Sequence, residues 1–184
     1  MQRISCSARR LAAHLKRGGL IAYPTESCYG LGCDPENRSA VLRLLRLKQR
    51  TQRKGLILIA SSFRQVERYL QPLTVSEQHR LVSAGAEAIT YLMPARHSTP
   101  FWLRGSHDTL AIRFTAHPLA HRLCHVIDSA LVSTSANHSG CKPARTYGDC
   151  LRLFGNKVWV LPGRVGKRKT PSRILAWADG KIIR

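Results

Sequence analysis

Short apolar runs of strand length alternate with amphipathic helical segments along the chain, and this alternation constrains the fold more than any other feature. The chain has no internal repeat, low-complexity tract or linker that would divide its 184 residues. We therefore predict an α/β fold and one domain over residues 1–184. The predicted strands cover residues 20–23, 30–33, 56–60, 89–93, 110–114, 130–134, 158–161, 172–176 and 181–183.

Helix starts are predicted from residues that can cap a helix N-terminus, and Pro118 suits the first turn of one helix. The pattern leaves open whether the sheet is parallel or mixed. Asp179-Gly180 is a typical hairpin turn, which favours some antiparallel pairing at the end of the chain. The predicted caps are Ser7, Ser39, Ser62 with Gln65, Thr74 with Glu77, and Thr146 with Asp149.

The chain is strongly basic, with 30 Lys and Arg against 10 Asp and Glu and a formal net charge of +20. Such a charge favours polyanionic partners, nucleic acid or polyphosphate, over a merely solvated surface. A non-catalytic RNA-binding protein acting in tRNA or rRNA maturation is therefore one candidate function. The basic loop Lys167-Arg168-Lys169 is equally compatible with an RNA contact and with simple solvation.

The spacing of the acidic residues and cysteines limits the kinds of metal site that the chain could form. The ten carboxylates are scattered apart from Asp34 and Glu36, which argues against two-metal nuclease or polymerase sites. The six cysteines include no C-x-x-C pair and no ligand-spaced Cys/His set. We predict no protein-bound metal, reduced thiols and a cytoplasmic location. The first 18 residues resemble a transit peptide, but a stripe of Leu11, Ala12 and Leu15 favours a folded helix, and no apolar run could span a membrane.

Three polar loops directly follow apolar segments, at residues 24–27, 48–54 and 133–137. In α/β proteins such loops converge where ligands bind. Lys48 and Arg50 could hold phosphate oxygens, although a solvated charge run is an alternative. The hydroxyls and the amide of 133–137 suit an anionic or ammonium group, or they satisfy their own turn. A serine nucleophile is disfavoured because no G-x-S-x-G elbow is present.

Four motifs in register, AYPTESCYGLGCDP, LKQR with KGLILIA, LAIRFTAHPL and LVSTSANHSG, resemble the YrdC/TsaC family over nearly the whole chain. The length resembles that of the short, single-domain threonylcarbamoyl-AMP synthases. The resemblance implies a nucleotidyltransferase that joins L-threonine, bicarbonate and ATP into threonylcarbamoyl-AMP and releases pyrophosphate. This product leads to N6-threonylcarbamoyladenosine at position 37 of tRNA through downstream threonylcarbamoyl-transferase proteins.

The same resemblance implies a YrdC-like domain, a twisted mixed sheet with flanking helices around a large positively charged cavity. It also implies Mg²⁺ carried by ATP, and the basic surface suggests tRNA or double-stranded RNA binding. A K-x-R and S-x-N set is expected to line the cavity, Thr25 to contact threonine, and further residues to face ATP or threonine. That set falls on Lys48, Arg50, Ser135 and Asn137, and the further residues are Arg113, Ser133, Ser172 and Arg184.

The chain departs from the family pattern at two places. One is the loop at residues 166–170, which reads Gly-Lys-Arg-Lys-Thr where the family commonly has a Gly-rich, weakly charged loop, and the other is a turn. Where the family has Pro-Gly-Pro-x-Thr, residues 86–90 read Ala-Glu-Ala-Ile-Thr. The restriction of proline and the freedom of glycine are both lost there.

Overall fold

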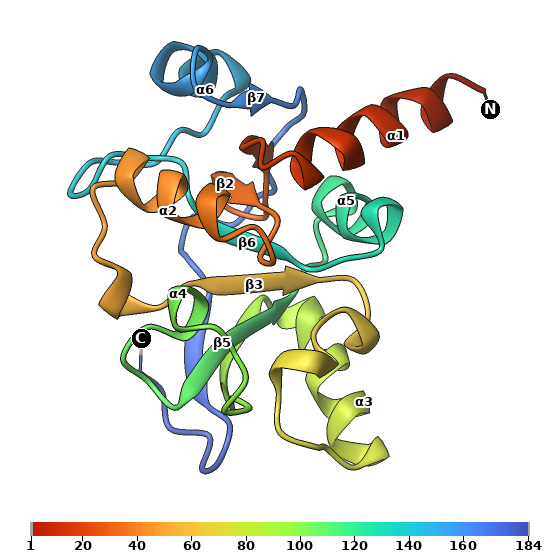
Figure 1. Ribbon diagram of the computed structural model, residues 1–184, viewed down its shortest axis with the longest axis vertical. Helices are drawn as coiled ribbons and strands as arrows, with labels where there is room; N and C mark the ends of the chain where they lie inside the picture. The colour runs from red at the N-terminus through yellow and green to blue at the C-terminus, as the bar shows by residue number, and fades with distance from the viewer. Residues whose placement is uncertain (1, 184) are drawn as a thin grey trace.

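The computed structural model describes residues 2–183, with side chains described for residues 8–183 apart from residue 86 (Figure 1). Its strands form one sheet in the order β7-β1-β2-β6-β3-β5-β4-β8. The strands are β1 (Ile21–Pro24), β2 (Tyr29–Cys33), β3 (Ile57–Ala60), β4 (Ile89–Pro94), β5 (Thr109–Phe114), β6 (Leu131–Ser135), β7 (Trp159–Val160) and β8 (Arg173–Ala176).

The sheet is mixed, which settles the question that the sequence pattern left open. β1 with β7, β3 with β5 and β4 with β8 pair in parallel, whereas β1 with β2, β2 with β6, β3 with β6 and β4 with β5 pair antiparallel. The predicted final hairpin is present, although residues 181–183 contribute only an isolated bridge, Leu175 to Ile182. The α/β prediction is confirmed.

Helices cover both faces of this sheet (Figure 1). α1 and α5 pack together over β1 and β3, where Leu11, Leu15 and Leu123 are buried. α2 packs on β2, and its Val41 and Leu44 belong to the larger core of the opposite face. The helices are α1 (Gln2–Lys16), α2 (Arg38–Leu47), α3 (Val75–Ser83), α4 (Phe101–Arg104), α5 (Pro118–Ile127) and α6 (Tyr147–Phe154), with short 3₁₀ turns at Gln52–Lys54, Phe63–Gln65, Glu67–Tyr69 and Ala84–Glu87.

Capping residues predicted some helix starts correctly and others wrongly. Thr74 forms its capping box with Glu77, and the Thr146 side chain accepts a hydrogen bond from the Asp149 amide. α2 begins two residues earlier than a cap at Ser39 would place it, because Asn37 caps it through the Ala40 amide at 3.0 Å. The prediction of Ser7 as a cap is also wrong, since residue 7 lies within α1.

The predicted helix after Ser62 is replaced by two short 3₁₀ turns. The Ser62 side chain makes no capping bond there. Instead, the side-chain oxygen of Gln65 accepts hydrogen bonds from the amide and hydroxyl of Ser61 at 2.9 and 3.2 Å. The side-chain amide of Gln65 donates to the Cys124 carbonyl, so this residue serves a tertiary contact rather than a capping box.

The turn that departs from the family pattern has a distinctive backbone. Ala88 has φ of 54°, in the left-handed region. Proline is confined to φ near −65°, so the turn in this chain has a conformation that proline at residue 88 could not adopt. Thr90, the one residue retained from the pattern, is buried on β4.

Gly32 lies in the middle strand of the β1-β2-β6 group, where a side chain would not fit. A Cβ there would lie 2.5 Å from the Val132 carbonyl oxygen and 2.9 Å from Cε1 of Tyr23. We predict that Gly32→Ala lowers the free energy of unfolding by about 2 kcal/mol or more, measured by chemical denaturation. Gly148→Ala on exposed α6 is the control, because nothing lies within 4 Å of its Cβ position. It should raise stability by about 0.5 kcal/mol, and equal losses in both variants would contradict the prediction.

Candidate active site

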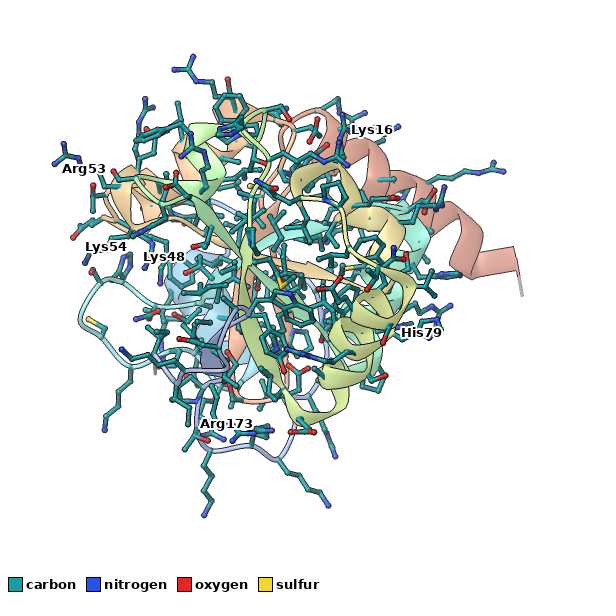
Figure 2. The ribbon with its side chains drawn as sticks, turned by 90° about the horizontal axis from the view of Figure 1, so that it is seen from below. Lys16, Lys48, Arg53, Lys54, His79 and Arg173 are labelled. Atoms are coloured by element: carbon teal, nitrogen blue, oxygen red, sulfur yellow. The ribbon has the colours of Figure 1, made fainter. Side chains whose placement is uncertain are left out.

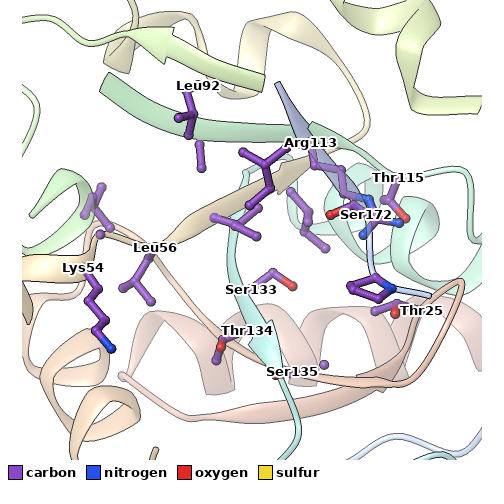
Figure 3. Close-up of a pocket in the computed structure, with 18 of the residues that line it drawn as sticks. Thr25, Lys54, Leu56, Leu92, Arg113, Thr115, Ser133, Thr134, Ser135 and Ser172 are labelled. Atoms are coloured by element: carbon purple, nitrogen blue, oxygen red, sulfur yellow. The ribbon is translucent and has the colours of Figure 1, made fainter. Parts of the chain in front are cut away.

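A cavity of about 430 Å³ opens where the turn after β1, the loop after α2, β5, β6 and the segment before β8 meet. Figure 3 shows Thr25, Arg113 and Ser172 gathered at one end, Lys54 at the other, and the β6 serines between them. The cationic side chains on its wall belong to Arg50, Lys54, Arg104 and Arg113, and its carboxylate is that of Glu26.

Arg113 and Glu26 form a buried ion pair on the cavity wall. Their side chains are each 12% exposed, and the guanidinium nitrogen lies 2.5 Å from the carboxylate oxygen. The second oxygen of Glu26 accepts from the Thr115 hydroxyl at 3.0 Å and from the Ala116 and His117 amides at 3.1 and 3.2 Å. Glu26 thereby joins the turn after β1, the end of β5 and the start of α5.

These partners keep Glu26 ionised. Burial alone would raise the pKa of its carboxyl group, but the Arg113 charge and the hydrogen bonds outweigh burial and hold that pKa below its ordinary value. Both oxygens of the carboxylate therefore already have partners within the protein. It orients Arg113 beside Thr115 and Ser172 (Figure 3).

Lys48 connects the end of α2 to the loop after β6. Its ammonium group donates to the carbonyl oxygens of Ser135 and Asn137 at 2.6 and 2.7 Å and to Oδ1 of Asn137 at 2.6 Å. The Ser135 hydroxyl donates to the same Oδ1 at 2.7 Å, and the Asn137 amide donates to the Cys141 carbonyl. These contacts form one network behind the cavity wall, in which all three ammonium protons of Lys48 have an acceptor.

The environment of Lys48 perturbs its titration. The residue is 5% exposed. Burial, and secondarily the charge of Arg50, lower the pKa of its ammonium group to about 8. With a pKa of about 8, Lys48 is mainly protonated at physiological pH but loses its proton at only slightly higher pH. Its three oxygen acceptors require the protonated form.

Two cations of the loop after α2 line the cavity. Arg50 donates to the Gly55 carbonyl at 2.9 Å and lines the cavity, as Lys54 does. Figure 2 shows Lys48, Arg53 and Lys54 on one side of the molecule. Gln49 before Arg50 has φ of 50°, the left-handed conformation that ends α2 and redirects the chain.

Hydroxyl groups on the cavity wall are themselves positioned by hydrogen bonds. Thr25 donates to the Cys28 carbonyl at 2.8 Å, which closes the turn after β1. The Ser133 hydroxyl accepts from the Tyr23 hydroxyl at 2.8 Å. The buried Ser172 hydroxyl lies 2.8 Å from that of Thr90.

The segment from 163 to 171 lies against the Thr25-Glu26 turn through main-chain contacts. The Gly166 amide donates to the Thr25 carbonyl at 2.9 Å, and the Arg168 amide donates to the Glu26 carbonyl at 3.1 Å. A Cβ at residue 166 would lie 2.7 Å from the Glu26 oxygen, so glycine allows this approach. The basic loop is therefore fixed beside the cavity by its backbone.

The structure brings together most of the residues that the sequence singled out. Lys48 and Asn137 lie behind the wall, joined to Ser135, rather than on the wall itself. Arg184 lies outside the described residues. Reasoning from sequence gave no role to Glu26 or Tyr23, although both belong to the AYPTES motif, which was the available signal. The predicted site residues that line the cavity are Thr25, Arg50, Arg113, Ser133, Ser135 and Ser172.

Residues 2–183 also bear on metal binding and on membrane spanning. No group of three or more His, Cys, Asp or Glu in that range is placed to hold a metal ion. Within the same range, every helix is too short or too polar to cross a membrane.

Comparison with known proteins places this geometry in a family. A family model described as telomere recombination, covering Sua5, YciO and YrdC, matches residues 13–184. Threonylcarbamoyl-AMP synthase from Methylobacillus flagellatus is 51% identical over 177 residues, which cover 96% of this chain and 98% of that protein. The Klebsiella pneumoniae protein of the same name is 45% identical over 174 residues, covering 94% and 92%.

Solved structures of similar fold support the same family assignment. P. abyssi Sua5 complexed with L-threonine superposes with a TM-score of 0.85 at 26% identity, covering 97% of this chain and 53% of that one. This chain thus spans about half the length of that Sua5 chain. E. coli YciO, at 21% identity and a TM-score of 0.79, shares the fold over 98% of this chain and 89% of its own. This chain belongs to the Sua5/YciO/YrdC family.

Proposed function

We propose that this protein is an L-threonylcarbamoyladenylate synthase that acts as one domain over residues 1–184. The observation that carries the proposal is the convergence of three distant polar loops on one cavity lined by Thr25, Arg50 and Ser133. Relatives named threonylcarbamoyl-AMP synthase, with up to 51% identity over nearly the whole chain, support it. The fold shared with Sua5 in complex with L-threonine supports a threonine site in the cavity.

The proposed reaction has two steps. The amine of L-threonine attacks the carbon of bicarbonate, or of CO₂ formed from it, and a C–N bond forms with net loss of water to give a carbamate. A carbamate oxygen then attacks the α-phosphorus of ATP. The bond from that phosphorus to the bridging oxygen breaks, and pyrophosphate leaves. Negative charge spreads over the phosphate oxygens in the second step, so positioning and charge stabilisation supply most of the catalysis.

The residues divide between direct contact and support. Arg50 supplies positive charge to the triphosphate, and Thr25 contacts threonine. Arg113, oriented by Glu26, presents its guanidinium to an anionic group, and Ser133 and Ser172 donate to substrate oxygens. Ser135 faces the cavity while Lys48 and Asn137 hold it from behind. Arg184 stays a predicted substrate contact.

Mg²⁺ is proposed to arrive with ATP and to neutralise phosphate charge. Among the described residues of the cavity wall, Glu26 provides the carboxylate, and this carboxylate is already paired with Arg113. This donor set fits an ion held by phosphate oxygens better than one held by protein ligands. The absence of a protein-bound metal stays a prediction.

The proposal is tested by incubating the protein with ATP, labelled bicarbonate and L-threonine and measuring threonylcarbamoyl-AMP and pyrophosphate. We predict that Arg50→Ala lowers turnover by about 100-fold, because it removes a preorganised charge. Arg46→Ala, on the exposed side of α2, is the matched control and should leave turnover unchanged. Full activity of Arg50→Ala, or of a Lys48→Ala, Arg50→Ala double variant, would contradict the site assignment.

A second candidate function is RNA binding, favoured by the net charge of +20. We propose that basic surface binds tRNA or double-stranded RNA, and that the product passes to downstream threonylcarbamoyl-transferase proteins in the cytoplasm. RNA affinity should then fall steeply with salt concentration. Salt-sensitive RNA binding without any threonylcarbamoyl-AMP formation would favour a non-catalytic RNA-binding protein instead.

A further inference from the structure

Tyr23 is a buried tyrosine of β1 whose hydroxyl group contacts a residue of the cavity wall. Its ring is 0% exposed and packs with the α1/α5 cluster that includes Leu15 and Leu123. Its hydroxyl donates to Ser133 Oγ on β6 at 2.8 Å. β1 and β6 are not neighbours, because β2 lies between them. The tyrosine side chain therefore crosses a whole strand to reach the serine.

Two glycines of β2 make this crossing possible. In the sheet register, Gly30 is the partner of Tyr23, and Gly32 is the partner of Ser133. A Cβ on Gly32 would lie 2.9 Å from Cε1 of Tyr23, and one on Gly30 would lie 3.4 Å from Cζ of Tyr23 and 3.5 Å from Ser133 Oγ. Because neither residue has a side chain, the ring can lie across β2.

The contact fixes the direction of the serine hydroxyl. A hydroxyl group has one proton to donate and two lone pairs. One lone pair of Ser133 is taken by Tyr23, and among the side chains described, those of residues 8–183 apart from residue 86, the Ser133 hydroxyl has no second partner. Its own O–H is therefore available to the cavity that Ser133 lines. A hydroxyl held by one strong neighbour has fewer orientations to lose when a ligand binds.

Resting on the function proposed above, we propose that Tyr23 is a positioning residue that orients the Ser133 hydroxyl as a donor to an anionic oxygen of the substrate. That oxygen belongs either to a phosphate of ATP or to the carboxylate of threonine. Burial raises the pKa of the Tyr23 phenol well above its ordinary value, so the phenol remains a donor over the whole assay range.

Steady-state kinetics of Tyr23→Phe, Ser133→Ala and the double variant test this role. Tyr23→Phe should lower kcat/KM by about 3- to 10-fold, and Ser133→Ala by about 10-fold or more. The double variant should be no worse than Ser133→Ala, because Tyr23 acts only through that hydroxyl. A rise in KM confined to ATP identifies a phosphate oxygen as the acceptor, and one confined to threonine identifies the carboxylate.

Thermal unfolding of the same proteins tests the hydrogen bond independently of activity. Ser133→Ala leaves the buried Tyr23 hydroxyl without an acceptor, so it should lower Tm more than the double variant does. Tyr29→Phe is the matched control, since this buried tyrosine donates to the Gly163 carbonyl at 2.8 Å instead. It should alter Tm without changing kcat/KM.

The outcomes separate the two proposals. A wild-type protein that forms no threonylcarbamoyl-AMP contradicts the proposed function. An active wild-type protein with multiplicative losses in the double variant contradicts the role of Tyr23 alone. Failure of Tyr23→Phe to fold, or equal kinetic losses in Tyr29→Phe, also overturns that role, because either result would mean that the phenol acts through the fold.

Discussion

Replacement of Lys48 with methionine should lower kcat/KM for ATP by about 100-fold or more while leaving the fold intact. Methionine has a similar length but provides no donor for the two carbonyl oxygens and the Asn137 side chain that Lys48 holds. The loop carrying Ser135 then loses its link to α2. Stability should change by less than about 2 kcal/mol, because the variant also removes the cost of burying a charge. Lys142→Met, an exposed lysine of the following loop, is the control and should keep full activity.

The pH dependence of ATP binding provides a second check on Lys48. With a folded-state pKa of about 8, Lys48 loses its proton in the folded protein at lower pH than in the unfolded chain. The cost of burying its charge is therefore complete below about pH 8 and is relieved as pH rises toward the unfolded pKa of about 10.4. ATP affinity, measured by calorimetry, should fall above about pH 8 without a loss of stability from this group. Unchanged affinity there, or full activity of Lys48→Met, would contradict the assigned role.

Glu26→Gln is expected to lower kcat/KM by about 10-fold or more and the free energy of unfolding by about 3 kcal/mol. Glutamine keeps the size of the side chain but leaves the Arg113 charge, 12% exposed, without its counter-ion. Glu87→Gln is the matched control, because the Glu87–Arg173 pair is 3.4 Å long with side chains 66% and 52% exposed. Such an exposed pair contributes about 0 to 1 kcal/mol. Equal effects of the two substitutions, in assays and chemical denaturation, would contradict the importance of the buried pair.

Acid denaturation should distinguish the wild type from Glu26→Gln as well. The pKa of Glu26 is lowered in the folded state, so the unfolded chain binds its proton more readily. The stability that Glu26 contributes is fully present above the unfolded pKa of about 4.3 and is lost as pH falls through the folded pKa. The stability difference between the two proteins should therefore shrink as the pH is lowered below about 4. A constant difference over that range would show that the charge of Glu26 is not responsible.

The sequence predicted the strands well because most are short apolar runs, and some of these runs are bounded by Pro or Gly. β3 ends at Ala60, as the pattern indicated, and β1 ends at Pro24, one residue beyond its predicted end. Helix starts were less predictable, because several polar residues compete for each cap. Asn37 and Ser39 are both good caps, and the tertiary position of the chain selects Asn37.

The candidate site could be predicted as a set of loops but not as a set of contacts. The polar character of residues 48–54 and 133–137 is visible in the sequence, and both loops border the cavity. That Lys48 faces the Asn137 side chain rather than the cavity depends on the packing of α2 against the sheet. The Glu26–Arg113 pair spans 87 residues, and a single sequence carries no local signal for such a contact.

The strand order has a consequence for how the chain is made. Both outer strands of the sheet, β7 and β8, come from residues 159–176, and they shield β1 and β4. During synthesis, β1 is complete after residue 24 and β4 after residue 94, long before their shielding strands leave the ribosome. Until then, each presents unpaired main-chain groups to other nascent chains. The nascent protein therefore passes through a period of exposure to aggregation that ends only when residue 176 has emerged.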